Sequence, residues 1–151
     1  MYFSKACEFD FEHGIDDWKK TGTVFNNQPT YGDNPTARNR GQPANQQGNW
    51  WIGGAENRSS KSSPAGNTQG DGPQGTLTSP FFTITGKNIS FLIGEGCDIK
   101  LVRAELVVGS KVKKQTNRKK KTKVNELRPK NCHIIQRVGM VKKVSSFRTQ
   151  P

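Results

Sequence analysis

Residues 76–108 read TLTSPFFTITGKNISFLIGEGCDIKLVRAELVV, and this stretch gives the strongest indication of fold class. It holds four strand-like runs, cut by the turn residues Ser-Pro, Gly-Lys and Gly-Glu-Gly, at residues 76–78, 81–85, 87–93 and 99–108. Short strands at this spacing are typical of antiparallel sandwiches. The sequence therefore predicts an all-β fold, specifically an antiparallel β-sandwich.

The last of these runs alternates between two faces, as a strand with one buried side does. Its apolar face consists of Val102, Ala104, Leu106 and Val108. Gly109-Ser110 follows directly, and glycine at this position predicts a tight hairpin turn.

Before this region, residues 46–57 (QQGNWWIGGAEN) place Trp50 and Trp51 side by side in a polar, turn-rich run. We expect a strand over residues 49–53. Adjacent side chains of a strand point to opposite faces, so one tryptophan can enter a core while the other looks outward or under a loop. The alternative is that both are packing residues.

Two long polar loops flank this strand. Residues 26–48 contain three prolines and almost no apolar side chain, and residues 54–75 are similarly polar. Loops of this length in a compact domain are usually functional or disordered, and we favour an ordered, functional loop. Further strands are expected at residues 7–12, where Phe9 and Phe11 alternate with acids, and at residues 21–25.

The net charge of +12 is unevenly distributed. Residues 1–98 carry 8 Lys and Arg against 10 Asp and Glu, a net charge of −2, whereas residues 99–151 carry 16 against 2, a net charge of +14. Blocks of like charge repel themselves and stay solvated. We therefore predict a module over residues 7–116 and a basic, poorly ordered tail over residues 117–151.

Other signals are weak. No run approaches the roughly 20 apolar residues of a membrane span, and residues 1–10 lack the apolar segment of a signal peptide. Cys7, Cys97 and Cys132 lack metal-ligand spacing, and both a Cys7–Cys97 disulfide and three free thiols stay open. Glycosylation triplets at Asn57 and Asn88 fit a secreted protein, although such triplets often occur by chance.

Several motifs carry a family resemblance. They are FDFE at 9–12, QPT at 28–30, GQP at 41–43, GNWWIG at 48–53, ENR at 56–58, GTLTSPFFTI at 75–84 and ISFLIG at 89–94. Together they resemble the non-catalytic jelly-roll module, of galactose-binding-like type, found beside levanase and invertase-like glycoside hydrolases and in extracellular multidomain proteins. Residues 7–12 are also similar to the start of MAM-type adhesion domains.

These modules close with further strands, one of which pairs with the first strand. Nothing similar follows Lys111 in this sequence. The resemblance thus implies a jelly roll that is incomplete at its C-terminal end. It also implies a structural calcium ion near Asp10 or Glu12, against the alternative that these carboxylates are merely solvated or hydrogen-bonded.

Sugar binding needs flat aromatic faces and planar hydrogen-bonding groups, which the tryptophan strand and its two loops supply. The candidate ligand-binding residues are Trp50, Trp51, Tyr31, Arg40, Glu56, Asn57 and Arg58. The alternative is that both tryptophans belong to the core, the loops are only solvated, and Arg58 pairs with Glu56.

No nucleophile elbow, phosphate loop or zinc-hydrolase motif is present, so we expect no catalytic residues. The predicted function is a non-catalytic carbohydrate-binding or adhesion module of an extracellular protein, with carbohydrate or an extracellular glycoprotein as partner. An accessory fragment of a levanase or invertase-like glycoside hydrolase is one alternative. Nucleic-acid binding through the basic tail is another, which the absence of interleaved aromatics in the lysine block disfavours.

Overall fold

The computed structural model describes residues 8–39, 43–83, 88–93, 100–116, 131–138 and 144–150. Every strand pair formed by these residues is antiparallel. The described residues form one four-residue helix, α1 (Asn34–Ala37), which begins at its N-cap Asp33. The all-β class predicted from the sequence is confirmed.

The largest sheet contains six strands. Its order is β2 (Lys19–Gly22), β5 (Gly75–Thr78), β10 (Asn131–Val138), β8 (Val102–Val108) and β9 (Lys111–Thr116), with β6 (Phe82–Thr83) also paired to β10. β5 and β6 pair with different parts of β10, because Ser79-Pro80 interrupts them and proline has no N–H to donate. The predicted hairpin joins β8 to β9, with Gly109 at φ 61°.

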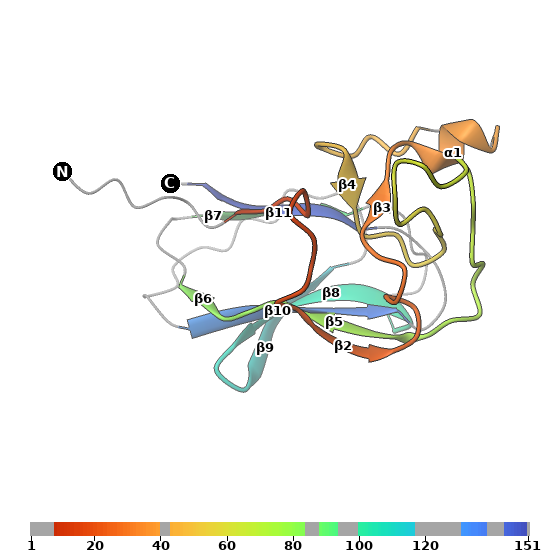
Figure 1. Ribbon diagram of the computed structural model, residues 1–151. Helices are drawn as coiled ribbons and strands as arrows, with labels where there is room; N and C mark the ends of the chain where they lie inside the picture. The colour runs from red at the N-terminus through yellow and green to blue at the C-terminus, as the bar shows by residue number, and fades with distance from the viewer. Residues whose placement is uncertain are drawn as a thin grey trace.

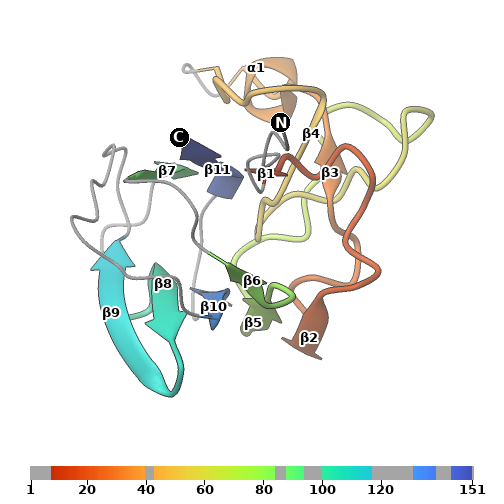
Figure 2. The same cartoon turned by 90° about the vertical axis from the view of Figure 1, so that its left-hand side faces the viewer.

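Two smaller sheets complete the sheet structure of the described residues. They are β1 (Glu8–Phe9), β11 (Val144–Gln150) and β7 (Asn88–Ile93), in that order, and the pair β3 (Thr30–Tyr31) and β4 (Trp50–Trp51). Figures 1 and 2 show β7 and β11 in a layer separate from that of the six-stranded sheet, with β3, β4 and α1 gathered at one side.

The apolar core contains side chains from both layers and from the turns between them. On β8 the predicted apolar face is buried, and Ala104, Leu106 and Val108 belong to the core cluster. From the other layer Phe9 packs against this cluster. Phe9 contacts Trp18 and Phe82 edge to face, with ring centroids 5.1 and 5.4 Å apart. The core is therefore formed by residues far apart in the sequence.

Two segments of the expected basic tail, β10 and β11, are strands within the sheets. β10 lies between β5 and β8 in the large sheet, and β11 lies between β1 and β7. These strands fall inside residues 117–151, predicted as poorly ordered, so the boundary at residue 116 does not separate sheet from tail. β10 contains the β-branched residues Ile134, Ile135 and Val138, and each of the two strands satisfies backbone groups of two neighbouring strands.

The expectation of an incomplete C-terminal end changes for the same reason. β11 pairs with β1, with Phe9 opposite Phe147, so the first strand has a partner. β11 also pairs with β7 on its other side, so it lies in the middle of its sheet.

Local boundaries differ from the expected strands near the start of the chain. β1 ends at Phe9, because the Asp10 carboxylate accepts a hydrogen bond from the Glu12 N–H and Phe11 adopts φ 65°. The run at residues 21–25 becomes the end of β2 followed by a turn, whose Val24 and Phe25 are buried. In the described part of the chain, no helix has the length and apolar character needed to cross a membrane.

Candidate functional site

The β3–β4 pair brings two of the predicted aromatic residues into contact. Tyr31 lies opposite Trp50, and Thr30 lies opposite Trp51. The Tyr31 and Trp50 rings meet edge to face, with centroids 5.1 Å apart and an interplanar angle of 62°. Since neighbouring residues of a strand face opposite ways, Tyr31 and Trp50 share one face of this pair. Both side chains are half-buried and so retain exposed surface.

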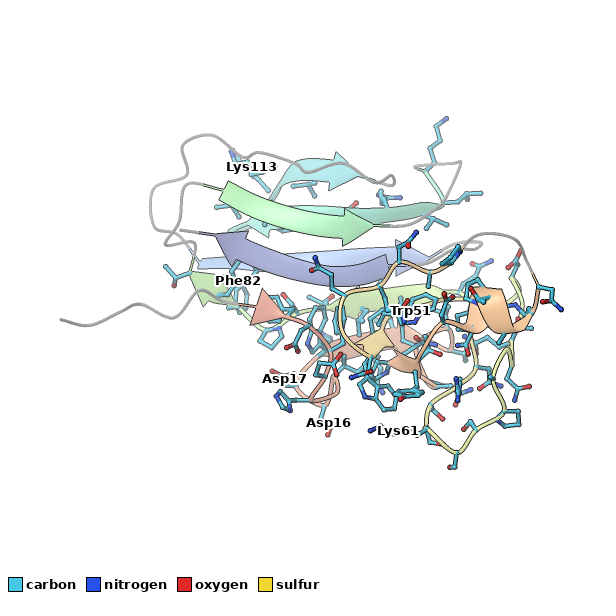
Figure 3. All side chains as sticks on the ribbon, turned by 90° about the horizontal axis from the view of Figure 1, so that it is seen from above. Asp16, Asp17, Trp51, Lys61, Phe82 and Lys113 are labelled. Atoms are coloured by element: carbon cyan, nitrogen blue, oxygen red, sulfur yellow. The ribbon has the colours of Figure 1, made fainter. Side chains whose placement is uncertain are left out.

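Trp51 has a different environment from Trp50. Its side chain is 0% exposed. The indole N–H donates to the Gly32 carbonyl at 2.8 Å, and the ring lies so close to Gly53 that a Cβ there would overlap it. Figure 3 shows Trp51 in the interior, among the segments around β4. A ligand therefore does not reach Trp51 in this structure, whereas Trp50 is half-buried and packs against the edge of the core cluster.

Two cationic groups lie over the Tyr31 ring. The guanidinium carbon of Arg58 is 5.0 Å from the ring centroid, and the ammonium nitrogen of Lys61 is 5.6 Å from it. Both distances fall within the roughly 6 Å range of cation–π attraction. We call the set of Tyr31, Trp50, Arg58 and Lys61 the Tyr31 surface. It combines aromatic rings with positive charge and hydrogen-bond donors.

Arg58 is fixed by backbone acceptors. Its Nε donates to the Ser63 carbonyl at 3.0 Å, and its Nη2 donates to the Lys61 carbonyl at 3.3 Å. The Arg58 carbonyl in turn accepts from the Tyr31 N–H at 2.8 Å. These contacts hold the second long loop, residues 54–75, against β3. The Arg58 guanidinium and the Tyr31 ring therefore keep a defined relative position.

Glu56 forms a bidentate ion pair with Arg38. Nη1 of Arg38 lies 2.5 Å from Oε2 of Glu56, and Nη2 lies 2.8 Å from Oε1. Hydrogen bonding to Glu56 raises the pKa of Arg38 above its ordinary value, against the opposing effect of burial. Glu56 is only 5% exposed, and both of its oxygens are engaged. The alternative pairing of Arg58 with Glu56 is wrong, because Arg38 occupies this carboxylate.

Buried amide side chains order the rest of the two loops. Gln28 donates to the Glu56 carbonyl at 3.1 Å and accepts from the Gly53 N–H at 2.8 Å. Asn34 donates to the Thr30 hydroxyl at 2.9 Å and accepts from the Gly66 N–H at 3.2 Å. Because each amide serves as both donor and acceptor, the polar loops gain fixed positions without a large apolar core.

The structure gives few or no side-chain contacts for the other residues singled out in the sequence. Asn57 is half-buried, and its N–H donates to the Asn67 carbonyl at 3.0 Å. Arg40 lies outside the described residues, as do Cys7 and Cys97. Asn88 and Cys132 lie in β7 and β10, where only the backbone is described.

The carboxylates considered for calcium bind the protein's own amides. Oε1 of Glu12 accepts from the Asn49 N–H at 2.6 Å and from the Trp50 N–H at 2.9 Å, and Asp10 accepts from the Glu12 N–H at 3.0 Å. No group of three or more metal-ligating side chains occurs within the described ranges. The hydrogen bonds of Glu12 instead connect the start of the chain to β4, at the position of Trp50.

Lys61, Arg38, Gln28 and Asn34 were not among the predicted site residues. Lys61 had no distinguishing signal, because an isolated lysine in a Ser-rich turn is ordinary. Its position depends on the turn closed by the Ser63 N–H donating to the Ser60 carbonyl at 3.3 Å, which brings Lys61 near Tyr31.

No family model matches this sequence, and no curated protein or solved structure is significantly similar to it.

Proposed function

We propose that this chain is a non-catalytic carbohydrate-binding module with a jelly-roll β-sandwich fold, and that the Tyr31 surface is its binding site. The order of the strands supports the fold, since two antiparallel sheets contribute to one core and the last described strand pairs with the first. The family resemblance of the motifs at residues 9–12, 48–53 and 75–94 supports the same fold. An extracellular setting follows from that resemblance.

One observation carries the proposed site: two partly exposed aromatic rings, Tyr31 and Trp50, lie in contact, and two cationic groups lie beside the Tyr31 ring. The apolar face of a sugar ring packs on aromatic side chains, while its hydroxyls need planar or charged hydrogen-bonding groups. Arg58 supplies such a group next to Tyr31.

The surrounding contacts make this surface rigid. Trp51, next to Trp50 in β4, is fully buried and donates to the Gly32 carbonyl, and the Arg38–Glu56 ion pair joins the loops on either side of β4. A binding site loses less conformational entropy on binding when its side chains are already fixed. In this proposal Trp50, Tyr31 and Arg58 contact the sugar, whereas Trp51 and Glu56 are supporting residues.

The test is glycan-array binding of the chain and its variants. We expect Tyr31→Ala to abolish binding and Tyr31→Leu, which retains apolar volume, to reduce it roughly tenfold or more. Phe81→Ala is the matched control, since Phe81 is an aromatic residue 71% exposed beside β6. Circular dichroism establishes that each variant is folded.

Absence of binding to every glycan on the array would overturn the proposal. Equal loss from Phe81→Ala and Tyr31→Ala would also contradict it, because the effect would then not belong to the Tyr31 surface. Release of product from a fructan by the purified chain would favour the glycoside hydrolase alternative.

A further inference from the structure

We infer that the Tyr31 surface selects acidic carbohydrates, whose carboxylate or sulfate groups bind Arg58 and Lys61. This inference rests on the proposed function and names its ligand class. Neutral sugars would need only the aromatic rings and uncharged donors. Here two positive charges lie within 6 Å of one ring, at 5.0 and 5.6 Å from its centroid.

The positive charge of this surface is not neutralised locally. Arg58 donates to two carbonyls, which carry no net charge. The nearest acid in the sequence, Glu56, is taken by Arg38. Within the part of the chain that the structure describes, neither Arg58 nor Lys61 has a carboxylate partner. An anion bound here would therefore interact with two cations that are not already paired with a carboxylate.

Donors remain for such an anion. Of the Arg58 guanidinium, Nε and Nη2 are engaged, and Nη1 has no hydrogen-bond acceptor among the described residues. Lys61 is exposed. Hydrogen bonds from cationic donors to an oxyanion are roughly twice as strong as bonds between neutral groups. Nη1 and the Lys61 ammonium thus supply the contacts that distinguish an acidic sugar from a neutral one.

Arg58 is held near the ring before any ligand binds, and the backbone of Lys61 lies in a closed turn beside it. The Arg58 carbonyl accepts from the Tyr31 N–H and from the Thr30 hydroxyl, the latter at 3.3 Å. Lys61 lies in the turn between Ser60 and Ser63, whose hydroxyls are 2.8 Å apart. The loop structure therefore fixes the Arg58 guanidinium beside Tyr31, and it brings Lys61 close enough for its exposed side chain to reach the same ring.

The charge distribution favours a sugar over a nucleic acid at this surface. Residues 1–98, which include all four residues of the Tyr31 surface, carry 8 basic against 10 acidic side chains. A long polyanion needs an extended positive surface and a series of aromatic rings for stacking. One aromatic pair with two cations fits a single charged sugar unit.

The experiment is calorimetric titration with matched oligosaccharides in neutral, carboxylated and sulfated forms. We expect the acidic forms to bind roughly tenfold more tightly than the neutral form, with an affinity that falls as salt is raised. Lys61→Gln should remove most of this difference between the acidic and the neutral forms. Lys113→Gln is the control, since Lys113 is also exposed and Figure 3 shows it at the opposite edge of the molecule from Lys61.

The outcomes separate this inference from the proposed function. Equal affinity for neutral and acidic forms, with binding still lost in Tyr31→Ala, overturns the inference and leaves the proposed function intact. No binding of any glycan overturns both. Tighter binding of a single-stranded oligonucleotide that is weakened by Lys61→Gln overturns the inference in favour of nucleic-acid recognition. Preference for only one of the two acidic forms supports it and identifies the anion.

Discussion

The six-stranded sheet and the loop region of residues 26–75 are ordered by different interactions. The sheet buries apolar side chains such as Leu77 and Leu106, which are 0% and 1% exposed. The loop region, apart from Trp51 and Ile52, is fixed by amides, caps and an ion pair that connect residues far apart in sequence. Polar order of this kind is directional, so it can hold a surface residue at a defined place without covering it.

The difference has a functional consequence. Apolar packing buries the side chains that it orders. The side of β8 that faces the core is therefore inaccessible to a ligand. The loop region instead leaves Tyr31, Trp50 and Lys61 partly or fully exposed while fixing the backbone beneath them. A binding surface is therefore expected where polar contacts, and not apolar packing, determine the local structure.

Truncating the sheet core should give the largest effect. Leu106→Ala should lower the free energy of unfolding by roughly 3–4 kcal/mol, because it removes buried atoms and leaves a cavity in a packed site. Urea denaturation measures this change. Val112→Ala, at a side chain 47% exposed on the neighbouring β9, should cost less than about 0.5 kcal/mol. Similar effects at both positions would mean that the sheet is not packed as described.

Removing the charge of Glu56 should give a smaller but clear effect on the loop region. Glu56→Gln should lower the free energy of unfolding by roughly 2–3 kcal/mol, because Arg38 loses its charged partner while remaining partly buried. The control is Asp71→Asn, an exposed acid of the same loop, which should change stability little. If Glu56→Gln changed the free energy of unfolding as little as Asp71→Asn does, the ion pair would not be what orders these loops.

The smallest of the three effects tests the contact between Glu12 and the loop. Gly48 adopts φ +75°, and a Cβ there would collide with the Glu12 carboxylate, so Gly48→Ala should cost about 2 kcal/mol. Gly70 has a similar φ of +71° with open space around it, so Gly70→Ala should cost only about 1 kcal/mol of backbone strain. Thermal denaturation compares the two variants, and equal losses would show that the Glu12 contact contributes nothing.

The same two regions differ in how well the sequence predicts them. The strands at 75–78, 88–93 and 102–108 follow from alternation and turn residues, which act over a few positions. In the loop region the composition indicated only an ordered loop. The partner of Glu56 is 18 residues away, and no local rule selects Arg38 over the nearby Arg58.

The strands near the C-terminus were missed for another physical reason. Charge density dominates residues 111–130, and like charges normally indicate solvated chain. β10 also places Ile134 next to Ile135, so its apolar residues do not alternate. β10 and β11 each have a neighbour on both sides, so pairing with strands far away in the sequence stabilises them. The pattern of residues within such a strand does not reveal that pairing.

The pairing of β1 with β11 has a consequence for synthesis of the protein. β1 is the first described strand to emerge from the ribosome, and its hydrogen-bonding partner is the last. Until residues 144–150 have been translated, a nascent chain carries Phe9 beside an edge that nothing covers, which is a hazard for aggregation. Closure of this sheet therefore has to wait for residues 144–150, long after Phe9 has been synthesised.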